Sequence, residues 1–414
     1  MKKQKYTSSL SILVLTISAF LFFSCESNTQ TSTEKTEIQQ VPKKEQSPST
    51  KIETAAFGAG NLTFAKNETC KECHPIIYDE FMKSSHSKST VYNDAIHAAV
   101  WDLHPKNLKF QQYTCGKCHT PGADNAADFI TAGKHGIPDS NNQSQAQGVS
   151  CAACHRIASM EQHEASNTIL FSTENKTYFA QRPNPKKDSY HDIITTNASF
   201  NRGDACLACH SHNHNKSNLP ICAMDIKVTD QKSGDNCMNC HMPQVEGSLS
   251  NERESGTHAF HGFPGTHNNQ EMLAEHMSIQ FGATKDKKGF VVIVQNRSPH
   301  DLFLQPLRVG KLKAKVIRNG KVIKEFKDQV FAKVLGADGK PTFPWKATEV
   351  IKNTILEKES AVTFNFEMAL QKGDQVELTF GYHLVNPKAA PKLKLENNTD
   401  ATKFRILKTS LFTI

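Results

Sequence analysis

Ten of the twelve cysteines of this 414-residue chain occur in five copies of one short pattern. Each copy has two cysteines separated by two residues and followed directly by a histidine. The copies are CKECH, CGKCH, CAACH, CLACH and CMNCH, ending at His74, His119, His155, His210 and His241. Thiols and imidazoles at this spacing could bind structural zinc, form a dithiol redox pair or hold a covalently attached haem.

Five copies favour haem attachment over the other two chemistries. Zinc ribbons pair their C-x-x-C units, so five would leave one unmatched, and zinc needs no histidine after every pair. A thioredoxin-like dithiol occurs once, whereas C-x-x-C-H is typical of c-type haem. In that arrangement each thiol forms a thioether to the porphyrin and the histidine supplies the proximal ligand to iron.

We therefore expect five covalently bound haem c groups, with the five histidines above as proximal ligands. The expected covalent anchors are Cys70, Cys73, Cys115, Cys118, Cys151, Cys154, Cys206, Cys209, Cys237 and Cys240.

Cys25 closes a segment typical of export. Basic residues near the N-terminus precede the apolar run at residues 10–23, and the small Ser24 stands before the cysteine. This order resembles a bacterial lipoprotein signal, so residues 1–25 are expected to be a signal peptide whose Cys25 is lipidated. An ordinary signal peptide and an uncleaved anchor are the alternatives, although the run is short for a span of about 20 residues. All three place the chain outside the cytoplasm.

Cys222, in NLPICAMDI, belongs to no pair. It is either a small buried hydrophobic residue or a reactive thiol beside a haem, useful in sulfur chemistry. We favour the first.

The composition excludes few classes of binding partner. The formal charge of +8 falls to +5 when the signal's three lysines are removed, and about ten haem propionates bring the holoprotein near neutrality. No basic stripe with interleaved aromatic residues indicates nucleic-acid binding. Hydrophobic residues make up 37% of the chain, which is low, so haem must supply part of the buried apolar surface. We expect haem attachment to be coupled to folding.

The organisation along the chain predicts an α+β protein. Residues 26–56 are polar and proline-containing, as in a disordered tether. Residues 57–276 contain all five motifs and should form a mainly α, loop-rich haem domain. Residues 277–414 lack cysteine and contain strand-like runs, among them two that flank Asn319-Gly320, a strong hairpin signal. This region should be an antiparallel β-sandwich for docking or stabilisation.

The sequences flanking the motifs carry a family resemblance. CKECHPIIYDEFMKSSHS, GVSCAACHRIASMEQH and CMNCHMPQVEG with the following SGTHAFHGFPGTH resemble multihaem cytochromes. The family groups the tetrahaem electron acceptor of hydroxylamine oxidoreductase with hydroxylamine oxidoreductase itself and cytochrome c nitrite reductase, and the resemblance covers about residues 65–267. It implies distal iron ligands at His86, at His163, and at His258 or His261. A fifth could come from His97 or His135, and His300 is a reserve candidate because its segment departs from the family pattern.

Two functions follow as expectations. The first is electron transfer by a lipid-anchored pentahaem cytochrome in the periplasm or at the outer membrane, between redox partners such as other cytochromes, quinol-oxidising complexes or terminal reductases. The second is an oxidoreductase for a small nitrogen or sulfur compound at one five-coordinate haem. No C-x-x-C-K variant, common at the catalytic haem of related nitrite reductases, is present, so we assign no catalytic residue and favour electron transfer.

Overall fold

A computed structural model of the protein describes residues 52–60, 62–107, 112–134, 136–182, 190–211, 213–222, 224, 236–252, 256–286 and 288–414. The expected signal peptide with Cys25, residues 26–51 of the expected tether, and His135 lie outside the described residues. Lys51–Ile414 forms one compact unit. Within the described ranges, no helix combines the length and apolar character needed to cross a membrane.

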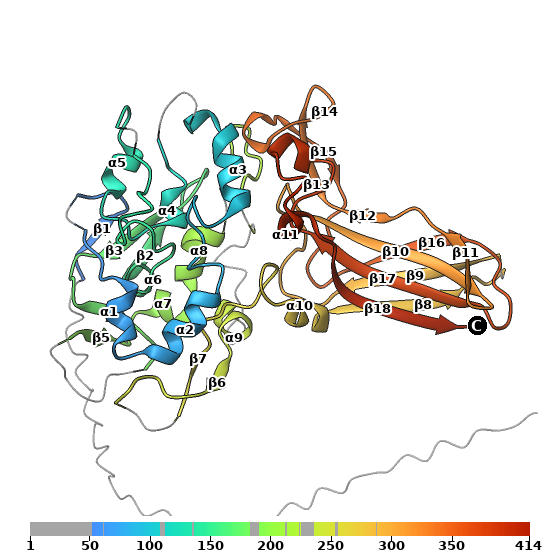
Figure 1. The fold of residues 1–414 in the computed structure, drawn as a ribbon, viewed down its shortest axis with the longest axis horizontal. Coiled ribbons are helices and arrows are strands. Elements are labelled where there is room, and N and C mark those ends of the chain that lie inside the picture. Colours follow the sequence, from blue (N-terminus) through green and yellow to red (C-terminus); the bar gives the residue numbers. More distant parts are fainter. Residues whose placement is uncertain are drawn as a thin grey trace, which may run out of the picture. The chain divides into compact units, whose positions relative to one another are not determined.

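The motif-bearing half of this unit contains short helices separated by loops (Figure 1). The helices are α1 (Asn67–Lys71), α2 (Pro75–Lys83), α3 (Ala95–Leu103), α4 (Gly116–His119), α5 (Ala126–Ile130), α6 (Cys151–His155), α7 (Ala198–Arg202), α8 (Asp204–His210) and α9 (Cys237–His241). Every C-x-x-C-H motif overlaps one of these helices, namely α1, α4, α6, α8 or α9. In α6, α8 and α9 one helical segment carries both thiols, whereas Cys73 follows α1 and Cys115 precedes α4.

Small sheets connect these helices. Their strands are β1 (Thr54–Ala56), β2 (Ile157–Glu161), β3 (Thr168–Ser172), β4 (Thr177–Phe179), β5 (Asp192–Ile194), β6 (Gln244–Glu246) and β7 (Thr257–Ala259). The order β1-β3-β2 makes one antiparallel sheet, β4 and β5 pair in parallel, and β6 pairs with β7. Strand β1 falls in the segment expected to be tether, because its backbone pairs with the apolar strand β3.

Polar residues in the sequence start several of these helices. Ser150 caps α6, Asn197 caps α7 and Asn236 caps α9, each accepting hydrogen bonds from backbone N–H groups of the first turn. Such caps satisfy donors that have no partner inside the helix. They allow helices of only five residues to begin at defined positions, which in α6 and α9 is the first cysteine of a motif.

The second half is built from antiparallel sheets. Its elements are α10 (Glu271–Glu275), β8 (Met277–Ala283), β9 (Gly289–Asn296), β10 (Val309–Arg318), β11 (Lys321–Glu325), β12 (Gln329–Phe331), β13 (Lys333–Ala337), β14 (Lys340–Pro341), the 3₁₀ turn Pro344–Lys346, β15 (Glu349–Asn353), β16 (Ala361–Glu367), β17 (Gln375–His383), the 3₁₀ turn Ala390–Leu393, α11 (Thr399–Thr402) and β18 (Arg405–Thr413). The main sheet has the order β11-β10-β17-β18, with β12 also paired to β10. The order β16-β9-β8 forms a second sheet and β14-β13-β15 a third.

The first two of these sheets share a hydrophobic core. Alternate residues of β9, including Phe290 and Val292, are fully buried and belong to one cluster with Val316, Leu378 and Phe380 of the main sheet. This alternation is the pattern of a sheet with one buried face. An antiparallel sandwich is therefore present in this half, and its core is made from side chains alone.

The predicted hairpin at Asn319-Gly320 is confirmed. It joins β10 to β11, with Arg318 opposite Lys321, and both turn residues have positive φ, 50° and 73°. Asparagine and glycine tolerate this conformation, which type I′ turns require.

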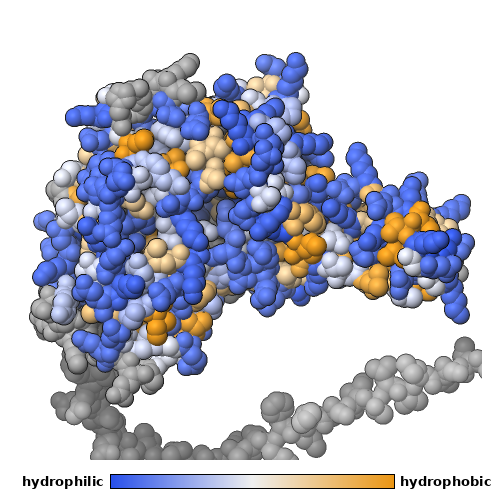
Figure 2. Space-filling model, in the orientation of Figure 1, coloured by the Kyte–Doolittle hydropathy of each residue, from blue (hydrophilic) through white to orange (hydrophobic). Residues whose placement is uncertain are grey.

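The expectation of a mainly α fold is not supported for the described chain as a whole, where strands outnumber helices. The motif-bearing half has more helices than strands, but its motif helices span only four to seven residues. Short helices of this kind have little stability of their own, so other contacts must hold them. Figure 2 shows that hydrophilic residues cover most of the viewed surface, with hydrophobic residues in small groups.

Candidate haem-binding site

A connected cavity of about 2560 Å³ runs through the motif-bearing half. It is lined by all ten motif cysteines and all five motif histidines, and every one of these thiols is free. A pocket for one small molecule has roughly 300–1,000 Å³. The size and lining of this cavity fit several large apolar groups attached through the thiols.

Backbone carbonyl groups orient four of the five proximal histidines. The Nδ1–H groups of His74, His119, His155 and His241 donate to the carbonyl oxygens of Leu249 (2.6 Å), Ser89 (2.9 Å), Phe179 (2.8 Å) and Pro264 (2.7 Å). A carbonyl can only accept, so each bond places the proton on Nδ1 and leaves Nε2 as the metal-binding nitrogen. The same bond fixes the orientation of the ring.

Four proximal histidines each face a second histidine ring. The ring centres are 6.3 Å apart for His74 and His191, 6.2 Å for His155 and His261, 6.4 Å for His241 and His300, and 5.9 Å for His210 and His86. The first three pairs are nearly parallel, within 22°, and the fourth is tilted by 46°.

This separation matches two axial ligands on one iron. An imidazole nitrogen binds a transition metal at about 2.0 Å, so two imidazoles on opposite sides of one iron have ring centres roughly 6 Å apart. Rings packed directly against each other would lie closer. The four pairs therefore fit bis-histidine ligation without rearrangement.

Burial keeps several of these imidazoles neutral. Removal from water lowers the pKa of His86 and of His261 to about 3, with smaller contributions from His210 beside the first and His155 beside the second. It lowers the pKa of His210 to about 4. A neutral imidazole is the form that binds iron, so these rings are prepared for ligation at neutral pH.

The third motif's leading Gly-Val positions His86. The N–H of Val149 donates to the carbonyl of His86 at 3.0 Å. Gly148 has φ +67°, and a Cβ there would lie 2.3 Å from that same carbonyl oxygen. Only glycine allows this close approach, so the start of one motif holds the ring that faces His210 of another.

The other expected distal residues have different surroundings. His258 uses both nitrogens on protein groups: Nδ1 contacts the Gly247 carbonyl at 3.1 Å, and Nε2 contacts Glu80 at 3.0 Å. The structure does not bring His163 to a proximal histidine, because its side chain is 53% exposed and its Nε2 lies 3.8 Å from Glu161.

His97 lies beside a proximal histidine but too close to share an iron with it. Its ring centre is 3.9 Å from that of His119. Its Nδ1 contacts the Ser89 carbonyl at 3.1 Å, and its Nε2 contacts the hydroxyl of Tyr113 at 3.3 Å. His97 therefore supports His119 from the side.

The sequence did not indicate His191 as a distal ligand, and it indicated His300 only as a reserve candidate. No motif surrounds His191. It lies near His74 because β5, the strand that directly follows it, pairs with β4. His300 lies in the loop after β9, so the β-rich half contributes to the site around the fifth motif.

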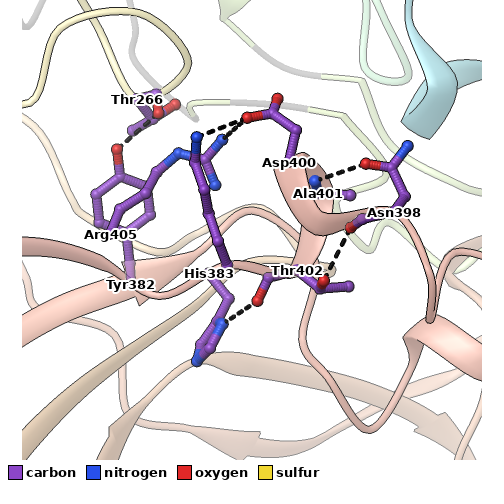
Figure 3. Close-up of polar contacts among 9 residues, drawn as sticks. Thr266, Tyr382, His383, Asn398, Asp400, Ala401, Thr402 and Arg405 are labelled. Carbon is purple, nitrogen blue, oxygen red and sulfur yellow. Dashed lines mark hydrogen bonds and ion pairs between the residues drawn. The ribbon is translucent and has the colours of Figure 1, made fainter.

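The β-rich half also holds the loop behind His241. The hydroxyl of Tyr382 in β17 donates to the Thr266 carbonyl at 2.6 Å, two residues beyond the Pro264 carbonyl that orients His241 (Figure 3). Around it, Arg405 contacts Asp400 at 3.0 Å and His383 contacts the Thr402 carbonyl at 2.6 Å. The Tyr382 bond anchors the loop to the end of β17, and the other two contacts join the ends of β17 and β18 to α11.

Thiols of different motifs are neighbours. The side chains of Cys70 and Cys151, of Cys118 and Cys209, and of Cys206 and Cys237 lie close enough to interact. The first motif thus adjoins the third, and the fourth adjoins both the second and the fifth. Cys154 of the third motif also interacts electrostatically with Cys206 and Cys209 of the fourth. All five attachment points therefore form one connected set.

Comparisons with known proteins show which proteins the chain is similar to. Residues 69–156 match the family described as cytochrome c554 and c-prime. A solved structure, a penta-heme cytochrome c552 from Thermochromatium tepidum, is 22% identical, with a TM-score of 0.69 over 86% of this chain and 99% of that one. No curated protein sequence matches. The structural likeness shows a common fold, and the chain is similar in this way to multihaem c-type cytochromes, the class that its five C-x-x-C-H motifs predict.

Proposed function

We propose that the protein is a pentahaem c-type cytochrome that transfers electrons. The observation that carries this proposal is the set of four histidine pairs at a separation of about 6 Å. Haem with two strong axial ligands supplies a site for one-electron exchange and has no open position for a substrate. In this chain the residues proposed to fill those positions are His74 with His191, His155 with His261, His210 with His86, and His241 with His300.

The adjacency of the attachment points supports transfer along a chain of sites. The thiol contacts connect the motifs in the order first, third and fourth, with the second and fifth both next to the fourth. Haems anchored at neighbouring thiols have their attached edges close together. Such a branched order would give electrons more than one point of entry or exit.

Two measurements on the purified holoprotein test this function. Intact mass should show five covalent haems on one chain, and low-temperature electron paramagnetic resonance of the oxidised protein should show low-spin ferric haem throughout. Fewer haems would contradict the count. A high-spin signal near one fifth of the total or above would argue against pure electron transfer.

One observation favours a second function. His119 has no histidine ring at about 6 Å among the described residues, so the second haem is the candidate for an open iron position. An oxidoreductase for a small nitrogen or sulfur compound would use such a position. Turnover of nitrite, hydroxylamine or tetrathionate by the reduced protein would support this alternative, and uniform inactivity would exclude these substrates.

We further propose that the chain is exported and anchored by lipid at Cys25, on the periplasmic or outer-membrane side of the bacterial envelope. The basic, apolar and small-residue order of residues 1–25 supports this placement. Its redox partners would then be other cytochromes, quinol-oxidising complexes or terminal reductases. A Cys25→Ala variant should lose the lipid mass and move from the membrane to the soluble fraction.

A further inference from the structure

Cys222 lies at the second motif, whose histidine has no opposing imidazole among the residues that the structure describes. The Cys222 thiol faces the His119 side chain closely enough for the two groups to interact. It also interacts electrostatically with Cys115 and with Cys118. Three members of the CGKCH motif thus have the same thiol as a neighbour, which makes this a site assembled from two distant segments.

Among the described residues, His97 and the paired histidines do not compete for this position. His97 is packed against His119 with ring centres 3.9 Å apart, and both of its nitrogens have protein partners. The other four proximal histidines already have their own paired ring. Cys222 is exposed, and the space it faces is the cavity that the motifs line.

Two side chains of the β-rich half support a negative charge on this sulfur. The Nε2–H of Gln305 donates to Cys222 Sγ at 3.6 Å. The guanidinium of Arg308 interacts electrostatically with Cys222, and its buried Nε has no hydrogen-bond partner in the part of the chain that the structure describes. A buried cation with an unsatisfied donor is costly unless an anion lies nearby. A thiolate at Cys222 would meet that need.

We propose that Cys222 is the distal ligand of the second haem, opposite His119. This proposal rests on the proposed function in one respect, the attachment of haem at Cys115 and Cys118. On binding, the Sγ–H proton would pass to solvent as the sulfur binds iron, with no change in the oxidation state of the iron. Gln305 and Arg308 act as positioning residues, since hydrogen bonds and charge near a ligating sulfur tune its donor strength.

This ligation would set the second haem apart from the other four. A thiolate donates more electron density to iron than an imidazole does. The second haem should therefore be the hardest of the five to reduce, and its position next to only the fourth motif would make it a side branch of the chain. It would also close the one open iron position on which the oxidoreductase alternative depends.

The test compares the holoprotein with Cys222→Ser and Cys222→Met variants by electron paramagnetic resonance of the oxidised state and by redox titration. The wild type should show a low-spin species with the narrow spread of g values that thiolate ligation gives, at about one fifth of the haem intensity. Cys222→Ser should remove it and leave the bis-histidine signals. Cys222→Met should remove it too and raise the midpoint potential of one haem, since Met/His ligation favours reduced iron.

His300→Met is the matched control, because it changes a distal ligand at the fifth motif. It should leave the narrow signal intact. A wild type with five low-spin haems but no narrow signal would overturn the proposal, as would a narrow signal that survives in Cys222→Ser. A deficit of haem in the wild type would instead contradict the proposed function, so the two failures are distinguishable by mass. Changes spread over all haems in Cys222→Ser, rather than one fifth of them, would also count against a ligand role.

Discussion

At the scale of the residue, a histidine is a ligand candidate only when one ring nitrogen faces the cavity. His258 and His261 are three residues apart, but their nitrogens have different partners. His258 contacts Gly247 and Glu80, whereas His261 contacts the Ala259 carbonyl through Nδ1 at 2.6 Å and faces His155. Glu80 also accepts from the backbone N–H of His261 at 2.9 Å. His258 and Glu80 thus position the segment from which His261 projects.

This difference predicts different spectra for two matched variants. His261→Gln should convert about one fifth of the haem to a high-spin form, because the third haem loses its distal imidazole. His258→Gln should leave the low-spin spectrum in place, since an amide can still contact Glu80. Electron paramagnetic resonance of both oxidised proteins is the measurement. The reverse pattern would assign the ligand to His258 and contradict the pairing with His155.

The covalent side of the site could be predicted from the sequence, and the distal side only in part. The C-x-x-C-H spacing is local, so it identifies anchors and proximal ligands without a fold. His86 and His261 stand near recognisable flanks. His191 has no such flank, because its place opposite His74 results from how β4 pairs with β5 and from nothing in its neighbours. Proximity between distant segments is a tertiary property, and no spacing rule records it.

At the scale of the element, the loop after β9 is held by one buried side chain. Asn296 is fully buried, and its amide donates to the carbonyl oxygens of His300 (3.0 Å), Leu356 (3.3 Å) and Glu357 (2.9 Å). Its Oδ1 accepts from the N–H of Ser298 at 2.9 Å. The loop that carries His300 therefore depends on a residue at the end of a core strand.

Asn296→Ala should lower the free energy of unfolding of the β-rich half by about 1–3 kcal/mol, because buried carbonyl groups lose their donor. It should also loosen His300 and broaden the low-spin signal of one haem. Chemical denaturation followed by circular dichroism measures the first effect, and electron paramagnetic resonance the second. Lys358→Ala, which removes an exposed side chain on the neighbouring loop, is the control and should change neither. Lost stability with unchanged haem signals would separate the loop from the fifth haem.

The β-rich elements were easier to predict than the motif-bearing ones for a physical reason. Asn-Gly between two alternating runs encodes its own turn, and β9 alternates buried and less buried residues along its length. The motif helices carry no comparable pattern, since each is about one turn long and faces a cavity. Their positions depend on caps such as Ser150 and on what fills that cavity. Periodicity could therefore not show where these helices begin or how short they are.

At the scale of the whole molecule, the two halves are stabilised in different ways. The β-rich half has a large cluster of buried side chains that includes Phe290, Val316 and Phe380. The motif-bearing half has a smaller cluster around Tyr113, Phe129 and Phe171, beside a cavity of about 2560 Å³. A core with so large a space inside lacks the contacts that hold a close-packed interior together. Attached haem would supply those contacts.

Folding of the motif-bearing half should therefore depend on haem attachment, while the sandwich should form without it. We expect chain produced without the haem-attachment machinery to lose amide protection over residues 67–241 and to keep it in β9, β10 and β17. Hydrogen exchange read by mass spectrometry measures both halves in one sample, with the holoprotein as control.

A Cys151→Ser/Cys154→Ser variant, which removes the attachment point of the third haem alone, is a milder perturbation for the same measurement. It should lose protection first in α6 and in α8 next to it, because thiols of the third and fourth motifs adjoin each other. Full protection of residues 67–241 in the haem-free chain would mean that this half folds without haem. Loss of protection in both halves would show that the sandwich depends on its contacts with the haem region, such as that of Tyr382 with Thr266.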